Sequence, residues 1–236
     1  MMNIEQYRHL MTADLLMGPN SLTILKELFE KHPLTPYFGA ALLDLGCGKG
    51  LTSLAVARET VAAVTACDLW ISPGDNAKRF DDWGVAEQVT AVQADANELP
   101  FEKGEFNALV SVDAYHYFAT EKGFFAEKIL PFLCDGAEVL IGIPGVKDEF
   151  TGRSAELLSD WLGDEAYMFQ SPRAWREIIG ENERIEALET WEMECFDTAW
   201  SGWFSTGHKY ALGDREFFET LIKPYTCFVG IYIKLK

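Results

Sequence analysis

The stretch Leu42–Gly50, LLDLGCGKG, decides how this chain folds. Apolar residues from Ala40 to Leu43 lead into Asp44, glycines follow at positions 46, 48 and 50, and a helix-like segment, LTSLAVARE, comes next. This order predicts a strand, a glycine turn and a helix. Glycine is needed where the backbone turns at positive φ or where a ligand approaches with no Cβ in the way, and the first N–H groups of a helix are free to bind a ligand. The stretch therefore indicates a site for a nucleotide-type cofactor.

The glycine spacing distinguishes between cofactors. A dinucleotide fingerprint needs G-x-G-x-x-G, but counted from Gly46 its third glycine falls on Leu51. The chain has D-x-G-x-G-x-G instead, which resembles motif I of the class I S-adenosylmethionine (SAM) dependent methyltransferases, in the type 11-like branch that acts on small molecules. SAM has a zwitterionic methionine end and no pyrophosphate. The motif residues that the resemblance assigns to SAM are Asp44, Gly46, Cys47, Gly48 and Gly50.

Aspartates at the ends of the next three predicted strands favour the same cofactor. Asp68 ends the run VAAVTACD, Asp95 ends VTAVQAD, and Asp113 follows NALVSV. Ligands of open α/β sheets bind outside the carboxyl ends of the strands, so we expect these three carboxylates and Asp44 to share one rim. A cationic sulfonium and an ammonium group suit such a rim, whereas a pyrophosphate does not.

Two of these acids have expected partners on the cofactor. Asp68 lies 18 residues beyond Gly50 (68 − 50), close to the roughly 20-residue spacing at which an acid meets a ribose hydroxyl in doubly wound folds. In the family that the chain resembles, an acid at the position of Asp95 accepts from the adenine amine, and the next residue, Ala96, contacts the ring through its backbone. An apolar residue usually follows the ribose acid, so Leu69 and Trp70 are expected to flank adenine.

The segment before the first strand closes over the cofactor in many members of that family. Residues 4–17 have apolar positions three and four apart, which predicts an amphipathic helix, and Gly18-Pro19 ends it. A second helix is expected after Asn20 or Ser21, either of which can cap it. Tyr7, Leu16 and Met17 are candidates for contact with the cofactor, although both helices also suit simple packing on the core.

Methyl transfer from SAM requires mainly the alignment of acceptor and methyl group, and a base only for acceptors that must lose a proton. His116, three residues past Asp113, is a candidate for that base. Two other roles stay open, because His116 is equally suited to form a wall of the substrate site or to bond inside the core. Tyr115 and Tyr117 share its loop and would add cation–π attraction if they face the sulfonium.

The acceptor side is expected within residues 145–210, where aromatic residues accumulate. The stretch DTAWSGWFSTGHKY, residues 197–210, is interpreted as an aromatic loop that lines part of that pocket. Arg153, Arg173 and Arg176 would suit a substrate carboxylate, but solvated surface positions are the simpler interpretation. The acceptor atom, whether O, N or S, stays open at this point.

Charge and composition limit the partners. The net charge is −17, from 37 acidic and 20 basic residues, which disfavours nucleic acid because phosphate binding depends on Lys and Arg. No apolar run reaches the roughly 20 residues of a membrane helix, and the N-terminus lacks the pattern of a signal peptide. Five cysteines without a C-x-x-C pair indicate neither zinc nor disulfides. We therefore expect a cytoplasmic monomer or homodimer that binds no metal and no membrane.

Together these features predict an α/β fold of one domain, residues 1–236, with a doubly wound, seven-stranded, mostly parallel sheet. The last strand is expected to be antiparallel, as in the Rossmann-like methyltransferase fold that the chain resembles. Residues 1–38 would form helices and a lid, residues 39–144 the cofactor-binding core, and residues 145–236 the substrate side. The predicted function is methyl transfer from SAM, with release of S-adenosylhomocysteine, to a small molecule. Two alternatives are a SAM-binding protein without transferase activity and an NAD-dependent oxidoreductase.

Overall fold

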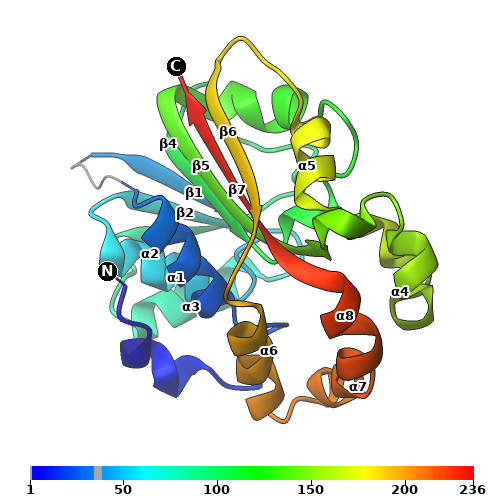
Figure 1. The fold of residues 1–236 in the computed structure, drawn as a ribbon. Helices are drawn as coiled ribbons and strands as arrows, with labels where there is room; N and C mark the ends of the chain where they lie inside the picture. The colour runs from blue at the N-terminus through cyan, green and yellow to red at the C-terminus, as the bar shows by residue number, and fades with distance from the viewer. Residues whose placement is uncertain (1, 35–38) are drawn as a thin grey trace.

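A seven-stranded sheet forms the centre of the computed structural model, which describes residues 2–34 and 39–236 (Figure 1). The strand order is β3-β2-β1-β4-β5-β7-β6. β7 runs antiparallel to both neighbours, and the other adjacent pairs are parallel, which confirms the predicted fold class. The strands are β1 (Ala41–Leu45), β2 (Ala63–Asp68), β3 (Val89–Gln93), β4 (Phe106–Val112), β5 (Leu133–Val146), β6 (Ile185–Glu192) and β7 (Thr226–Leu235).

Helices cover both faces of this sheet, so its central strands consist almost entirely of buried apolar residues, as expected for parallel strands buried on two sides. α1 (Ser21–Lys31), α2 (Leu51–Glu59) and α3 (Pro73–Asp82) cover one face, and α5 (Pro172–Ile179) covers the other (Figure 1). Each face has its own cluster of buried side chains: Leu25 and Leu54 belong to the first, and Trp175 and Ile178 to the second.

The remaining helices are α4 (Ser154–Leu162), α6 (Phe196–Ser205), α7 (Lys209–Phe217) and α8 (Lys223–Tyr225). In Figure 1 helices α6, α7 and α8 lie at the end of the sheet away from the C-terminus, which is the end where the parallel strands finish. Helices α6, α7 and α8, which follow β5 in the chain, therefore form a second layer over the carboxyl ends of the parallel strands.

Two predicted elements differ from the structure. Residues 197–210 are not a loop but most of α6 and the start of α7, because Trp200 and Trp203 lie three apart on one buried face of a helix. The helix predicted over residues 4–17 is a 3-10 helix, Ile4–Leu10, followed by turns. After β4 the chain also forms a π turn, Phe125–Ile129, and a 3-10 turn, Leu130–Phe132, that contains Pro131.

The second N-terminal helix, α1, begins as predicted. Asn20 is its N-cap, and the side-chain Oδ1 accepts hydrogen bonds from the N–H groups of Leu22, at 3.1 Å, and Thr23, at 3.4 Å. Such a cap satisfies donors that the helix itself leaves free. Residues 35–38, which end the predicted lid region, lie outside the described residues.

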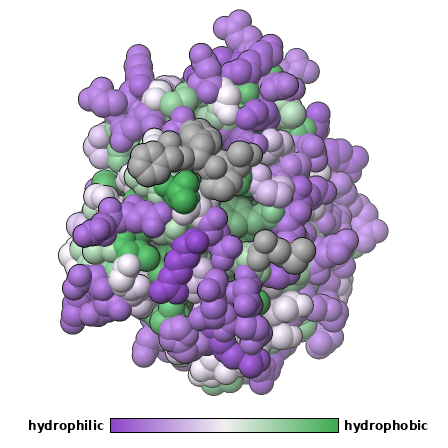
Figure 2. Space-filling model, turned by 90° about the vertical axis from the view of Figure 1, so that its left-hand side faces the viewer, coloured by the Kyte–Doolittle hydropathy of each residue, from purple (hydrophilic) through white to green (hydrophobic). Residues whose placement is uncertain are grey.

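Hydrophilic residues dominate the face of the molecule that Figure 2 shows. The hydrophobic areas on this face are small and separated. None of the helices in residues 2–34 and 39–236 combines the length and the apolar character needed to cross a membrane. All five cysteines are free thiols in the structure.

Candidate functional site

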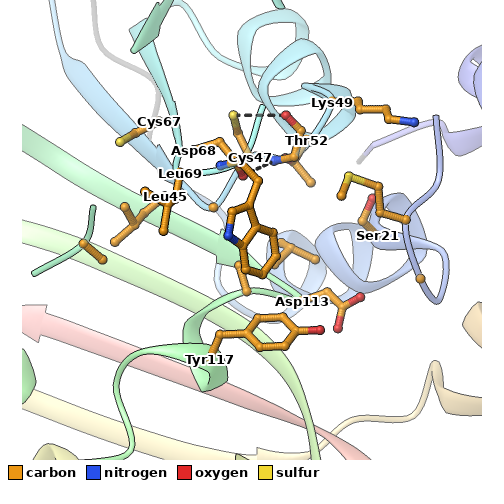
Figure 3. Close-up of a pocket in the computed structure, with 18 of the residues that line it drawn as sticks. Ser21, Leu45, Cys47, Lys49, Thr52, Cys67, Asp68, Leu69, Asp113 and Tyr117 are labelled. Carbon is orange, nitrogen blue, oxygen red and sulfur yellow. Dashed lines mark hydrogen bonds between the residues drawn. The ribbon is translucent and has the colours of Figure 1, made fainter. Parts of the chain in front are cut away.

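A cavity of about 350 Å³ lies at the carboxyl ends of β1 to β4 (Figure 3). Its walls come from the glycine loop after β1, from the turns after β2, β3 and β4, and from the N-terminal segment 15–21. The sheet order reverses between β1 and β4, and ligands of open α/β sheets bind at such a switch point. The volume falls in the range of roughly 300–1,000 Å³ of small-molecule sites.

The three glycines of the loop all have positive φ, at 75° for Gly46, 52° for Gly48 and 84° for Gly50. Gly46 and Gly48 line the cavity. A Cβ on Gly46 would lie 2.2 Å from the Cβ of Ala114, so this glycine also lets the loops after β1 and β4 approach each other. Gly50 is not part of the lining, because its open side is filled by the ring of Phe80, 2.5 Å from where a Cβ would stand.

Asp44 lies behind the cavity wall rather than in it. The residue is fully buried, and its Oδ2 accepts hydrogen bonds from the hydroxyls of Thr52, at 2.7 Å, and Ser53, at 2.6 Å. Burial raises the pKa of this carboxyl to about 6. The structure thus corrects the expected direct contact: Asp44 connects β1 to the first turn of α2 and thereby positions the glycine loop.

Asp68 lines the cavity and organises its wall. Its Oδ2 accepts the N–H of Gly48 at 2.8 Å, and its Oδ1 accepts the N–H groups of Trp70, at 2.8 Å, and Ile71, at 3.0 Å. Each carboxylate oxygen has two lone pairs, so Oδ2 keeps the capacity to accept from a ligand hydroxyl. Cys47, in the loop that Asp68 binds, lines the same wall (Figure 3).

Four apolar side chains form the rim of the cavity: Met17, Leu69, Trp70 and Tyr117. They are unusually exposed for such residues, from 47% for Leu69 to 66% for Trp70. The rings of Trp70 and Tyr117 meet edge to face, with centroids 5.7 Å apart. Grouped apolar exposure at the mouth of a cavity indicates a binding surface.

Asp95 and Ala96 line the wall beyond β3, where they were expected. Asp95 is exposed, and its Oδ1 accepts the backbone N–H and the side-chain amide of Asn97, each at 2.8 Å. These hydrogen bonds hold the pKa of Asp95 below its usual value. Asn97 belongs to the lining as well.

Asp113, at the end of β4, has the only positive φ of a non-glycine residue in the described part of the chain, 55°. Its N–H donates to the carbonyl of Gly142 at 2.8 Å, and its carboxylate lies in the cavity, on the same side as Tyr117 (Figure 3). Burial, with the charge of Asp214 as a smaller contribution, raises the pKa of Asp113 to about 7.

Three candidate contacts are corrected by burial away from the cavity, an alternative that the sequence had left open for Tyr7 and His116. Tyr7 is fully buried and donates its hydroxyl to Glu59 at 3.4 Å. Tyr115 is also fully buried, and its ring lies 5.9 Å from that of Trp175. His116 is 2% exposed, its Nδ1 has no partner among the described residues, and burial lowers its pKa to about 3. None of these three residues lines the cavity, so His116 does not have the position of a base. Leu16, a further candidate from the N-terminal segment, is also buried and does not line the cavity.

The N-terminal segment 15–21 closes one side of the cavity, and Met17 belongs to it as predicted. The ammonium group of Lys49 donates to the backbone carbonyl of Asp14, and the N–H of Asn20 donates to the carbonyl of Ala199 in α6 at 3.0 Å. The segment is thus fastened between the glycine loop and α6. The sequence did not identify most of the residues with which this segment lines the cavity, and Gly18-Pro19 is its one local signal. The lining residues that were not predicted, from this segment and from the loops after the strands, include Leu15, Gly18, Pro19, Ser21, Lys49, Thr52, Asn97 and Phe118.

No group of three or more His, Cys, Asp or Glu side chains placed to hold a metal ion occurs within residues 2–34 and 39–236. The polar groups that surround the cavity include backbone N–H groups, which donate, and the carboxylates of Asp68, Asp95 and Asp113, which accept. This chemistry suits an organic ligand that carries hydroxyls and a positive charge.

Comparison with known proteins agrees with this geometry. Residues 42–130, which begin in β1 and include the glycine loop and the first four strands, match a family model described as a methyltransferase domain. A curated relative, the tRNA (carboxymethyluridine(34)-5-O)-methyltransferase alkbh8 of Xenopus tropicalis, is 27% identical over 124 residues, which are 52% of this chain and 18% of that protein. The chain therefore spans less than a fifth of the length of this relative.

Solved structures show the same fold over most of the chain. The geranyl diphosphate C-methyltransferase of Streptomyces coelicolor A3(2), in complex with Mg²⁺, geranyl diphosphate and S-adenosyl-L-homocysteine, has a TM-score of 0.72 at 16% identity, covering 90% of this chain and 79% of that one. The phosphoethanolamine N-methyltransferase 2 of Haemonchus contortus, in complex with S-adenosyl-L-methionine, has a TM-score of 0.68 at 19% identity, covering 94% and 54%.

Proposed function

We propose that this chain, whose residues 42–130 match a methyltransferase-domain model, is a class I SAM-dependent methyltransferase that transfers a methyl group from SAM to a small-molecule acceptor. One observation carries the proposal. The cavity lies at the switch point of the sheet, and its wall combines a glycine loop at positive φ with a carboxylate, Asp68, that ends β2. This is the position and the chemistry that the D-x-G-x-G-x-G motif predicts.

The lining residues fit SAM. The open lone pairs of Asp68 suit the ribose hydroxyls, and Leu69 with Ala96 offers apolar surface for adenine. Asp95 lies beside them with an oxygen, Oδ2, that accepts no hydrogen bond from the described residues and suits the adenine amine. The backbone of Gly46 and Gly48 leaves room for the methionine end.

When bound, SAM would supply a methyl group activated by its positively charged sulfur. The protein then has to hold the acceptor in line and exclude water, which supplies roughly 7–11 kcal/mol in well-oriented reactions. The N-terminal segment 15–21 and the rim of Met17, Leu69, Trp70 and Tyr117 are placed to do this.

A small acceptor is supported by charge and by the neighbours. The net charge of −17 opposes the binding of a polyanion, although one relative is named as a tRNA methyltransferase. The structural neighbours include complexes with geranyl diphosphate and with phosphomonomethylethanolamine. The same acidity and the five free thiols support a cytoplasmic protein, as a monomer or a homodimer, that binds neither nucleic acid nor a membrane.

Calorimetric titration with SAM, S-adenosylhomocysteine and NAD tests the cofactor. We expect the two adenosyl ligands to bind with micromolar affinity and NAD not to bind. Incubation with SAM and mixtures of small acceptors, followed by detection of S-adenosylhomocysteine, then tests the transfer. Binding of NAD alone, or of no ligand, would contradict the proposal, and cofactor binding without product across all acceptor classes would favour a SAM-binding protein that performs no transfer.

A further inference from the structure

Two aromatic rings at the mouth of the cavity come from different turns and contact each other. Trp70 lies in the turn after β2, and Tyr117 lies in the 3-10 turn after β4. The ring centroids are 5.7 Å apart at an interplanar angle of 69°, which is an edge-to-face contact. Both residues line the cavity. The ring pair therefore spans the mouth of the cavity between these two turns.

The strand order shows on which side of the cavity the pair lies. In the order β3-β2-β1-β4, β3 and β4 are on opposite sides of β2. The ring of Trp70 reaches the turn after β4, whereas Asp95 and Ala96, the residues proposed for adenine, follow β3. Trp70 thus extends away from the residues proposed for adenine and leaves them to the cofactor.

The main chain of both residues is fixed, although their rings are open to solvent. The N–H of Trp70 donates to Asp68 Oδ1 at 2.8 Å, and the N–H of Tyr117 donates to the carbonyl of Ala114 at 3.0 Å. The side chains nevertheless remain 66% exposed for Trp70 and 48% exposed for Tyr117. Large apolar side chains that are held in place and left uncovered beside a cavity indicate a surface for a ligand.

The proposed binding mode of SAM brings the acceptor to these rings. It assigns the ribose to Asp68 and the methionine end to the backbone of Gly46 and Gly48. The methyl-bearing sulfur joins these two parts of SAM, so the acceptor has to reach the region where the N–H of Gly48 meets Asp68 Oδ2. Trp70 is bonded to the same carboxylate, and Tyr117 contacts Trp70. An acceptor that enters from the mouth therefore passes against the ring pair.

The charges of the cavity oppose an anionic acceptor. Three carboxylates belong to the lining, those of Asp68, Asp95 and Asp113. Lys49 is the one Lys or Arg of the described cavity lining, and its ammonium group donates to the backbone carbonyl of Asp14. A phosphate or carboxylate group on the acceptor would be repelled by these carboxylates.

We propose that Trp70 and Tyr117 determine the specificity for the acceptor, which is a molecule without phosphate or carboxylate groups whose apolar part packs against the two rings. The inference rests on the proposed methyl transfer and specifies its acceptor. Met17 and Leu69 extend the same apolar rim. Binding of an apolar group there removes exposed apolar surface from water, which is favourable.

Two parts of SAM are competing partners for the rings. An aromatic face attracts a cation, so rings that bind the sulfonium would favour SAM over the uncharged sulfur of S-adenosylhomocysteine. A ring that stacks on adenine would contribute equally to the binding of both. An acceptor wall requires neither dependence, because the acceptor is then a separate molecule.

The test measures, by ligand-observed NMR, the binding of benzyl alcohol to the protein saturated with S-adenosylhomocysteine. Benzyl alcohol has an apolar ring and no charge, and phenyl phosphate is the anionic counterpart with the same ring. We expect benzyl alcohol to bind saturably and phenyl phosphate to bind more weakly. Binding of phenyl phosphate that is as tight as that of benzyl alcohol would overturn the exclusion of anionic acceptors.

Variants of the two rings then locate the site. Trp70→Ala and Tyr117→Ala should each weaken the binding of benzyl alcohol about fivefold, the scale of one aromatic contact. Trp70→Phe and Tyr117→Phe keep a ring and should restore most of the affinity. Val61→Ala is the control, because it trims an apolar side chain that is 58% exposed, outside the lining and just before β2. Thermal melts of each variant verify that it is folded.

Calorimetry with SAM and S-adenosylhomocysteine on the same variants separates this inference from the proposed function. If S-adenosylhomocysteine does not bind the wild type, the proposed function fails. If it binds but benzyl alcohol does not saturate, or if both alanine variants bind benzyl alcohol as the wild type does, the acceptor wall is wrong and the proposed function stands. Weaker binding of SAM alone in the alanine variants would assign the rings to the sulfonium, and weaker binding of both cofactor forms would assign them to adenine. Either result overturns the inference.

Discussion

The carboxylate of Asp68 accepts a hydrogen bond from the backbone N–H of Gly48 at 2.8 Å, and this contact joins the turns after β1 and β2 across the cavity. The same carboxylate caps the N–H groups of Trp70 and Ile71. The Asp68 side chain thus fixes the glycine loop after β1 and the turn after β2 in place without a ligand. A site arranged in advance loses less free energy when it binds.

Replacing Asp68 by alanine should weaken binding of S-adenosylhomocysteine by about 1.5–3 kcal/mol, the scale of a hydrogen bond to a charged group. Asp68→Asn keeps an oxygen acceptor for Trp70 and Ile71 and should lose less. Calorimetry on the two variants measures both effects. Equal affinity of Asp68→Ala and the wild type would show that Asp68 holds neither the ribose nor the glycine loop.

Gly46→Ala should lower the free energy of unfolding more than Gly104→Ala does. Both glycines have positive φ, 75° and 66°, which costs an alanine roughly 1–2 kcal/mol. Only Gly46 adds a collision, with the Cβ of Ala114 at 2.2 Å, whereas Gly104 has open space. Crowding of this kind adds about 1–3 kcal/mol. Urea unfolding gives the two free energies, and equal losses would show that the approach of the two loops does not matter.

The glycine loop and the strand-end acids could be predicted because both depend on local sequence. Positive φ at Gly46 and the burial of an apolar strand follow from a few adjacent residues. The position of Asp68 at the end of β2 follows from the parallel arrangement of the strands. Of the four strand aspartates expected on one rim, Asp68, Asp95 and Asp113 line the cavity, whereas Asp44 lies behind its wall.

The parts that sequence reasoning missed depend on packing between distant segments. His116 lies in the interior, within the 3-10 turn Tyr115–Tyr117, and the local sequence alone did not decide between this and its two other possible roles. Residues 196–205 form a helix because their tryptophans pack on the core. The hydrogen bond from the indole of Trp161 to Asp214 joins residues 53 positions apart, and no periodicity in the sequence predicts it.

His116→Phe should change how stability depends on pH. Burial lowers the pKa of His116 to about 3, below the value of about 6.5 in an unfolded chain. The unfolded state therefore binds more protons between these values, and the wild type loses stability as the pH falls below about 6.5, by at most about 1.4 kcal/mol per pH unit. The variant should lack this loss. Melts at pH 8 and pH 5 measure it, with His9→Phe, at an exposed position, as the control; an unchanged pH slope would show that His116 is not held neutral.

In the absence of ligand, Asp113→Asn should change the pH dependence of stability in the direction opposite to that of His116→Phe. The pKa of Asp113 is raised to about 7, above the value of about 3.9 in an unfolded chain. The folded state binds more protons between these values, so the wild type loses stability as the pH rises from 4 to 7. The variant should melt above the wild type at pH 8 and converge with it near pH 4. For a chain of this length each 1 kcal/mol corresponds to about 2–4 °C, and a constant difference in melting temperature would mean that the carboxylate is solvated.

Lys49→Met should speed the release of S-adenosylhomocysteine. The ammonium group of Lys49 donates to the carbonyl of Asp14 and fastens the N-terminal segment to the glycine loop, where Met17 covers Gly48. An exposed hydrogen bond of this kind contributes about 1 kcal/mol, so the dissociation rate should rise about fivefold. Stopped-flow displacement measures that rate, and Lys122→Met, at an exposed position outside the lining, controls for the lost charge. If both variants release the ligand at the wild-type rate, the segment does not limit release; if Lys122→Met alone is faster, long-range charge rather than the contact with Asp14 governs it.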